Sequence, residues 1–304
     1  MKDEPLSARV WKFLRVAIGL GAIFAVVGFV FAWWWADRAM ATVYAVNDPP
    51  LPLREDGAAV ERGRHLYSIL GCVECHGKDA AGKVIIDDAG IGRFVASNLT
   101  PGTLPASYTA NALGHAIRNG VRPDGTPLRF MPVGDWNHLG DADTAALVAY
   151  LRSLPPVRNN LGDFEVGPLA RVLFLLGEFH LVPAADIDHS PRRRDTPDPA
   201  PTAAYGAYLA QACTGCHGSD FAGQRVPGTP PEMPAARNLT PHSDGLAGWN
   251  RTDFGRALRQ GKSRDGRSLH PLMPYGAYAA MSDDDVTAIW AHLQSLPAKP
   301  GRPK

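Results

Sequence analysis

Two copies of a five-residue motif, Cys-X-X-Cys-His, contain all four cysteines of the sequence. On a helix, cysteines at positions i and i+3 lie on one face, and the histidine at i+4 lies there too. The two sulfurs can then bond to the two vinyl groups of one porphyrin, while the imidazole faces the iron. Each copy therefore predicts one covalently attached haem c, bound by Cys72, Cys75 and His76 or by Cys213, Cys216 and His217.

Other uses of paired cysteines fit the pattern less well. A structural zinc site needs four ligands, and its cysteine pairs usually lie about 15–20 residues apart. Here the two pairs are 141 residues apart. A thioredoxin-like redox pair requires a βαβ unit that the pattern does not show. A disulfide between i and i+3 would be strained and would give the histidine no role.

A haem iron bound by one histidine has a sixth coordination position. Met131 and Met273, each followed by proline, lie 55 and 56 residues beyond the two motif histidines. A thioether ligand raises the reduction potential and blocks access of small molecules to iron. We therefore predict that His76 and Met131 bind one iron and that His217 and Met273 bind the other. A methionine can instead simply fill the core, and other candidate ligands are Met233, Met281, His65, His115, His138, His270 and His292.

The chain after residue 50 repeats itself at an offset of about 141 residues. Besides the motifs, Asn98–Pro101 recurs as Asn238–Pro241, and Ser153–Pro155 recurs as Ser295–Pro297. This repeat indicates two tandem domains of one fold. We predict a flank and anchor over 1–45, a first domain over 46–157, a linker over 158–198 and a second domain over 199–304.

Each copy predicts the same order of helices. One helix precedes the motif, a short one follows it, and a last one closes the domain with apolar residues at helical spacing. With 31 glycines and 27 prolines, much of the remainder must be turn and loop. We find no alternating strand pattern and predict the all-α class. Five of the expected helices lie around Ala58–Tyr67, Ala112–Arg118, Asp143–Leu154, Tyr208–Leu209 and Asp253–Arg259. The last helix of the second copy should begin after Ser282, a candidate N-cap with Asp285 three residues further on.

One apolar segment, Leu169–Val182, lies between the two copies. It contains Arg171, Glu178 and His180, so it is too short and too charged to span a membrane. We expect a helix packed across the interface of the two domains. The alternative is a helix that lies at the membrane surface or docks a partner.

The N-terminal region contains 20 uncharged residues, Val16–Trp35. A helix of this length spans a hydrocarbon core of about 30 Å. Basic residues are concentrated before it, so the positive-inside rule keeps the N-terminus in the cytoplasm. We predict a single-pass anchor in the cytoplasmic membrane, with both haem domains on the periplasmic or outer side. Ala39–Ala41 also has the form of a signal cleavage site, and a cleaved signal would export the same domains. The basic residues are Lys2, Arg9, Lys12 and Arg15.

Four further residues are candidates for the surroundings of the haems. Asn98 and Asn238 either hold a loop beneath the haem propionates, together with the threonine two residues on, or cap a plain turn. Trp136 and Tyr278 each follow the candidate methionine by five residues. They either line the edge of the haem or serve as ordinary core aromatics.

These motifs resemble class I cytochrome c domains over residues 55–156 and 200–298. The tandem arrangement with an anchor is similar to the membrane-bound dihaem cytochrome c family, which includes cytochrome subunits of periplasmic alcohol, aldehyde and gluconate dehydrogenases. The resemblance implies that the first and last helices of each domain cross at a glycine facing an aromatic residue. Gly63 and Tyr150 fit this pattern. In the second copy Gly206 fits the glycine, but the counterpart of Tyr150 is His292, a departure for which we expect the nearby Trp290 to compensate.

Two functional hypotheses follow. The first is an electron carrier, not itself an enzyme, whose partners are a dehydrogenase, a quinol-oxidising complex or a terminal oxidase. The second is a dihaem peroxidase-like enzyme, which needs one iron with an open or displaceable sixth position. The two matched methionines favour the carrier. With 31 basic and 30 acidic residues, no charge surplus points to nucleic acid.

Overall fold

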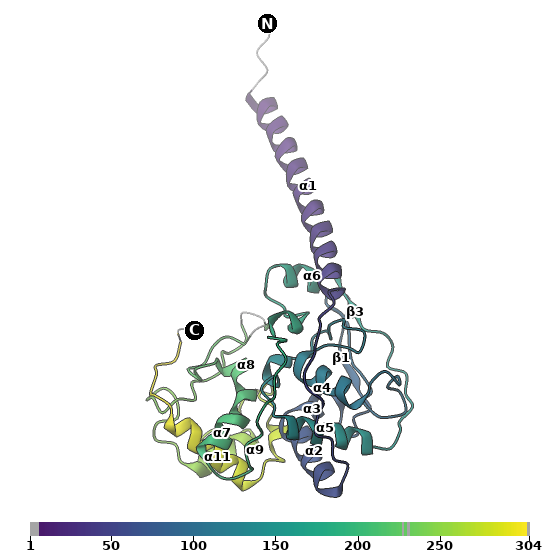
Figure 1. Ribbon diagram of the computed structural model, residues 1–304. Coiled ribbons are helices and arrows are strands. Elements are labelled where there is room, and N and C mark those ends of the chain that lie inside the picture. Colours follow the sequence, from purple (N-terminus) through teal and green to yellow (C-terminus); the bar gives the residue numbers. More distant parts are fainter. Residues whose placement is uncertain (1–5, 227, 230–231, 303–304) are drawn as a thin grey trace.

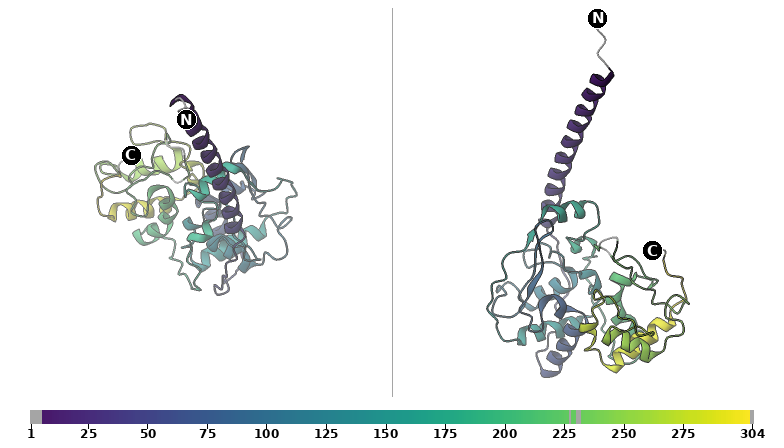
Figure 2. Two further views of the ribbon diagram at one scale, coloured as in Figure 1. Left: turned by 90° about the horizontal axis from the view of Figure 1, so that it is seen from above. Right: turned by 180° about the vertical axis from the view of Figure 1, so that it is seen from behind.

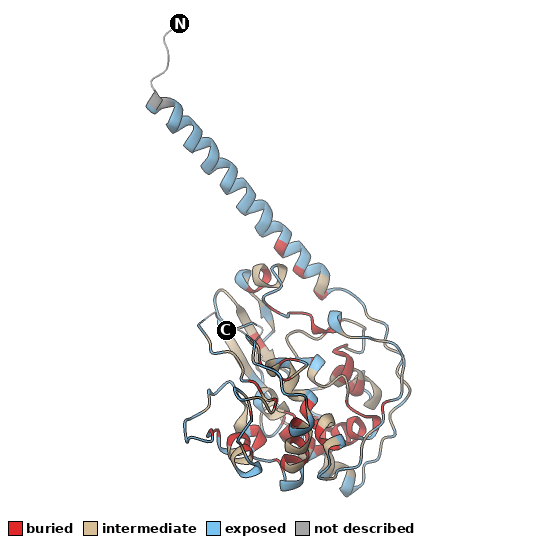
Figure 3. Cartoon of the chain, turned by 90° about the vertical axis from the view of Figure 1, so that its left-hand side faces the viewer, coloured by how far each residue is buried: buried red, intermediate tan, exposed pale blue. Residues whose placement is uncertain are grey.

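A single long helix, α1 (Leu6–Met40), projects from the rest of the computed structural model, which describes residues 6–226, 228–229 and 232–302. Its length and composition suffice to cross a membrane, and it contains the predicted span 16–35. Figure 3 shows that α1 is exposed along most of its length and buried only near its base, at Ala32, Ala36 and Met40. Of the basic residues expected before the span, Lys2 lies outside the described residues.

The first domain is built around two crossed helices, α2 (Gly57–Ile69) and α5 (Asp141–Ser153). Asp56 caps α2 by accepting a hydrogen bond from the Ala59 amide. The short motif helix α3 (Cys72–His76) follows α2 directly. Helix α4 (Ala110–Asn119) and the 3₁₀ turn η1 (Val133–Asp135) complete the domain and lead back to α5.

The second domain repeats this plan beside the first (Figures 1 and 2). Helices α7 (Ala203–Ala210) and α11 (Asp283–Ser295) form the crossed pair. The predicted N-cap is confirmed, because Ser282 and Asp285 form a reciprocal capping box. The remaining elements are η3 (Gln211–Cys213), α8 (Thr214–His217), α9 (Arg251–Gln260) and α10 (Tyr275–Tyr278).

Both helix crossings require glycine. A Cβ atom at Gly63 would overlap the carbonyl oxygen of Ala146 and lie 2.7 Å from Cβ of Tyr150. A Cβ atom at Gly206 would lie 2.9 Å from the amide nitrogen of Ile289. Backbone therefore packs on backbone in both domains, as the resemblance implied. In the second domain, Trp290 does not replace the missing aromatic at the crossing but packs on Phe254, 5.5 Å between ring centroids.

A small sheet in the first domain shows that the expectation of no strands was wrong there. Strands β1 (Lys83–Asp88), β2 (Gly92–Ala96) and β3 (Glu165–Val166) pair antiparallel in the order β1-β2-β3. Phe94 on β2 is fully buried and packs on three other phenylalanine rings. This aromatic cluster holds the sheet against the domain. The protein is nevertheless mostly helical, so the predicted class is confirmed with the sheet as an addition.

Helix α6 (Pro168–Leu175) corrects a second expectation in part, because the helix itself packs on the base of α1. The segment that follows it contacts the second domain, where Glu178 pairs with Arg225 at 3.4 Å. The guanidinium of Arg171 stacks over the Trp33 ring at 4.0 Å and donates a 2.6 Å hydrogen bond to Asp37. A partly buried guanidinium needs an acceptor and an aromatic face, and the end of α1 supplies both. The contact holds the anchor against the first domain.

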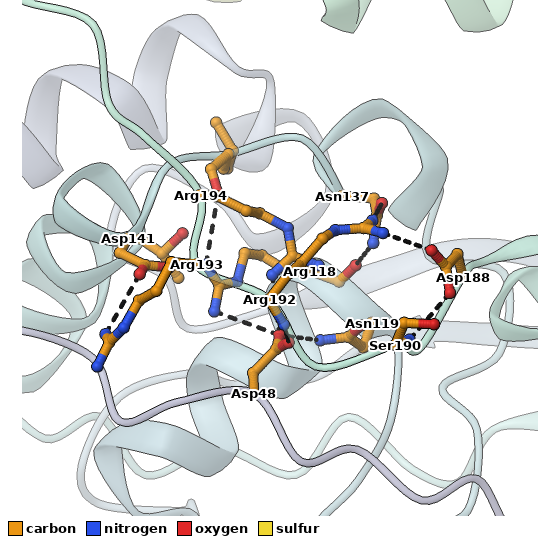
Figure 4. Close-up of polar contacts among 12 residues, drawn as sticks. Asp48, Arg118, Asn119, Asn137, Asp141, Asp188, Ser190, Arg192, Arg193 and Arg194 are labelled. Carbon is orange, nitrogen blue, oxygen red and sulfur yellow. Dashed lines mark hydrogen bonds and ion pairs between the residues drawn. The ribbon is translucent and has the colours of Figure 1, made fainter.

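The linker after η2 (Pro183–Asp186) is held in the first domain by ion pairs (Figure 4). Asp48 is almost fully buried and pairs with Arg194 at 3.0 Å and Arg118 at 3.3 Å. Arg118 also bonds Asp141, the first residue of α5, at 2.6 Å. Although burial raises the pKa of Asp48, hydrogen bonds from Asn119 and Arg194 outweigh it and hold that pKa below its usual value.

The two domains meet through a buried polar contact. Arg62 of the first domain pairs with Asp143 at 2.8 Å, and Tyr208 of the second domain donates to the same carboxylate at 2.9 Å. His65 lies 2.9 Å from Asp285 across the interface. Each member has a partner, so the contact fixes how the domains sit. The residue numbers of the predicted domain boundaries stay a prediction.

Candidate haem sites

Glycines with positive φ lie at the ends of the two motif helices. Gly71 and Gly77 flank the first motif, both at φ 80°, and Gly218 follows the second at φ 82°. All four cysteines are partly buried, and no disulfide joins any of them. Burial raises the pKa of the Cys72 and Cys213 thiols to about 12. Both are therefore neutral in an apolar setting, unlike the thiolates of redox-active pairs.

Each motif histidine is oriented by a backbone carbonyl. Nδ1 of His76 lies 2.8 Å from the Ser97 oxygen, and Nδ1 of His217 lies 2.7 Å from the Arg237 oxygen. A carbonyl only accepts, so Nδ1 carries the proton and Nε2 keeps its lone pair for a metal. Burial lowers the pKa of both histidines, which favours this neutral form.

A cavity of about 840 Å³ adjoins the first motif. Its size lies within the range of about 300–1,000 Å³ for small-molecule and cofactor sites. The cavity brings together six of the predicted residues, together with apolar side chains from α4, α5 and β2. Those six are Cys72, Cys75, His76, Asn98, Met131 and Trp136.

Three of the predicted residues of the second domain lie at one apolar cluster, which also contains residues of the first domain. Cys213 and Met273 are partly buried against this cluster, and Tyr278 lies within it. Burial raises the pKa of Tyr278 well above its usual value, and the nearby Cys213 and Cys216 add to the effect. Tyr278 therefore lies beside the motif. The rival Met281 is a buried core residue, 7% exposed.

Asn98 and Asn238 have equivalent contacts within their own domains. The Asn98 side chain accepts from the Thr100 amide and donates to the Val157 oxygen at 2.8 Å. Asn238 accepts from the Thr240 amide and donates to the Lys299 oxygen at 2.7 Å. Each amide thus ties its turn to the chain that follows the last helix. These contacts correspond to the turn-capping alternative, while the propionate role stays a prediction.

Sequence reasoning missed two arginines that line the cavity, Arg122 and Arg129. The guanidinium of Arg129 lies 5.8 Å from the Phe164 ring centroid. Its buried Nε has no hydrogen-bond partner among the described residues. The repeat gave only a weak signal for Arg129. Its counterpart in the second copy is His270, another nitrogen-containing side chain shortly before the candidate methionine.

The residues of the first cavity fit a haem. Two cysteines and an imidazole with a free Nε2 adjoin one cavity, and a thioether lies in its wall. The Nε of Arg129, which lacks a hydrogen-bond partner among the described residues, would meet an acceptor in a haem propionate carboxylate. When bound, the haem iron supplies reversible one-electron exchange between its ferric and ferrous forms.

Comparison with protein families agrees with this geometry. The family model described as cytochrome c oxidase, cbb3-type, subunit III matches residues 58–151, and the cytochrome c model matches residues 203–297. The chain therefore contains two cytochrome c-type domains in tandem. Their Cys-X-X-Cys-His motifs are of the kind that attaches haem c covalently.

Curated relatives are similar to parts of the chain. The cytochrome c subunit of alcohol dehydrogenase (quinone) from Gluconobacter oxydans is 27% identical over 282 residues, covering 81% of this chain and 56% of the relative. The gluconate 2-dehydrogenase cytochrome c subunit of Pantoea cypripedii is 38% identical over 95 residues, 29% of this chain and 22% of the relative. The fructose dehydrogenase cytochrome subunit of Gluconobacter japonicus is 32% identical over 117 residues, which cover 34% of this chain and 24% of the relative. The chain thus spans little more than half the length of these relatives at most.

Proposed function

We propose that this protein is a dihaem c-type cytochrome that transfers electrons and does not itself catalyse substrate chemistry. His76, Met131, Cys72 and Cys75 would hold one haem. His217, Met273, Cys213 and Cys216 would hold the second. A methionine ligand on each iron would leave no open position for oxygen or peroxide.

The observation that carries this proposal is the duplicated histidine geometry. Both motif histidines hydrogen-bond a backbone carbonyl through Nδ1, at 2.8 and 2.7 Å, one in each domain. Such a contact fixes an imidazole as a metal ligand and increases its basicity. A structural histidine in a loop would have no need of the same arrangement twice.

We further propose that the partner is a dehydrogenase and that the domains lie on the outer side of the cytoplasmic membrane. The dehydrogenase subunits among the relatives support the first point. The basic residues before the apolar part of α1 support the second. Asn98, Asn238, Trp136 and Tyr278 would surround the haems.

Optical spectroscopy of the detergent-solubilised protein tests electron transfer against the peroxidase alternative. We expect two low-spin haems that show the weak sulfur-to-iron absorption at the red edge of the ferric spectrum. The ferrous protein should not bind carbon monoxide. A high-spin iron, or turnover of peroxide at enzymatic rates, would instead establish a peroxidase-like enzyme. Protease digestion of intact spheroplasts tests the side, because only outward-facing domains would be cut.

A further inference from the structure

The two motif helices face each other's domains in a reciprocal way. Gly215 in the second motif lies against Asp135 of η1, the turn that follows Met131: a Cβ atom at Gly215 would lie 2.6 Å from the Asp135 carboxyl oxygen. Glu74 in the first motif lies against Gly276 of α10, the helix that follows Met273: a Cβ atom at Gly276 would lie 3.6 Å from the Glu74 carboxyl oxygen. In the repeat, Glu74 corresponds to Gly215, and Asp135 corresponds to Ala277, since each of the latter two follows the candidate methionine by four residues. Each contact pairs one acid with one glycine, and the second domain has no acid at the position of Asp135.

The two contacts place unequal charges beside the two motifs. Glu74 is exposed to solvent, whereas Asp135 is partly buried, with its carboxylate against Gly215 of the other domain. Burial raises the pKa of Asp135 to about 6, against the opposing hydrogen bond from the Gly215 backbone. Salt and water screen an exposed charge far more than an enclosed one. Asp135 should therefore act on its surroundings more strongly than Glu74 does.

The surroundings of the Asp135 carboxylate belong to the second domain. The ionisable side chains whose pKa values its charge raises are Cys213, Cys216 and Tyr278. The residue is not part of the lining of the first cavity, although its neighbours Met131, Pro132 and Trp136 are. Asp135 thus comes from one domain and directs its charge to the motif of the other.

We propose that Asp135, contributed by the first domain, lowers the reduction potential of the haem held by the second domain. The proposal rests on the proposed function, since it concerns a haem on Cys213, Cys216 and His217. A ferric haem carries one more positive charge than a ferrous haem. A nearby carboxylate therefore stabilises the ferric form and lowers the potential.

The arrangement would give two haems with the same ligand types different potentials. The corresponding position in the second domain is Ala277, so the first haem receives no carboxylate from that position. The charge of Asp135 biases an electron toward the first haem. Because the acid and the glycine meet across the domain interface, this bias depends on the domains staying docked.

Potentiometric titration of the full-length holoprotein, with Asp135→Asn, tests the proposal. The replacement keeps the size of the side chain and removes its charge. We expect the ferric-to-ferrous ratio of the second haem at fixed potential to change three- to tenfold, which is about 28–59 mV upward for a one-electron couple. The first haem should shift much less. Met273→Ala identifies which titration component belongs to the second haem, because loss of a thioether ligand moves that component downward.

Asp284→Asn is the matched control, because it removes one exposed carboxylate from the second domain. It should leave both potentials in place. Equal shifts of both haems in Asp135→Asn, or no shift of the second, would overturn the proposal. The count and spin state of the haems are measured in the same samples. If the proposed function is wrong, the count or the spin state of the haems will differ from two low-spin haems, whatever the effect of Asp135→Asn.

The pH dependence of the wild type provides a second measurement. The titratable groups that face Asp135 are Cys213, Cys216 and Tyr278, with His138 next to its backbone carbonyl. Thioether bonds would remove the two thiols, and the Tyr278 pKa lies above the range tested. The potential of the second haem should therefore fall as pH rises through about 6, and Asp135→Asn should abolish this change. An identical fall in the Asn variant would assign it to another group and contradict the proposal.

Discussion

Gly63→Ala should strongly destabilise the first domain, because the α2–α5 crossing has no room for a methyl group. The new Cβ atom would overlap the Ala146 carbonyl oxygen and lie 2.6 Å from its carbon and 2.7 Å from Cβ of Tyr150. These are backbone atoms or atoms next to the backbone, so no flexible side chain can yield and the helices must separate. Overpacking of this kind costs about 1–3 kcal/mol. A backbone clash belongs at the upper end, about 3 kcal/mol. For a domain of roughly 100 residues this lowers the melting temperature by about 12–24 °C, at ~4–8 °C per kcal/mol.

Gly57→Ala on the same helix is the control. No atom lies within 4 Å of the added Cβ there. Alanine in a helix is more favourable than glycine by about 0.5–1 kcal/mol, so this variant should melt at the same or a slightly higher temperature. Thermal unfolding of the full-length protein in detergent, followed by circular dichroism, measures both. Equal melting temperatures for Gly63→Ala and the wild type would refute the packing argument.

Other predictions concern the proposed ligands, the buried ion pairs and the base of the anchor. Met131→Ala and Met273→Ala should each remove the sulfur-to-iron absorption from one haem and lower its potential; loss from both haems at once would contradict separate sites. Asp48→Asn removes the carboxylate that pairs with buried Arg194, leaves Arg118 with Asp141 alone, and should cost about 3–5 kcal/mol in urea unfolding. Asp188→Asn, at an exposed position, should leave the urea midpoint almost unchanged. Because the folded pKa of Asp48 is lowered, its stabilisation is present above the unfolded pKa of about 3.9 and is lost as pH falls through the folded pKa. Arg171→Ala should speed amide exchange in α6 by removing the contacts to α1; unchanged exchange would show that these contacts do not hold the helix.

Much of the fold could be predicted because its signals are local and occur twice. The helices carry apolar residues at helical spacing, and the capping pair Ser282 and Asp285 lies three residues apart, as local hydrogen bonding requires. The crossing glycines Gly63 and Gly206 were identified by resemblance, and the structure gives the physical reason for both. Repetition of these signals 141 residues apart distinguished them from chance.

The features that sequence analysis missed depend on contacts between distant segments. Strands β1 and β2 have no counterpart strand in the described part of the second domain, so the repeat gave no support for them. Helix α6 reaches α1 through Arg171 and Trp33, 138 residues apart, and nothing local marks that pair. The histidine contacts end on backbone carbonyls, which every residue has. Only the difference between Asp135 and Ala277, at equivalent positions of the repeat, is visible in the sequence.

The number of covalent haems per chain tests the central claim most directly. Intact-mass spectrometry of the purified protein under denaturing conditions keeps thioether-bound haem and loses haem that is held only by coordination. We predict the mass of the chain plus two haems. Double variants Cys72→Ala/Cys75→Ala and Cys213→Ala/Cys216→Ala should each carry one haem. A wild-type mass with one haem or none, or haem extracted by acid acetone, would contradict the claim that both domains bind haem c.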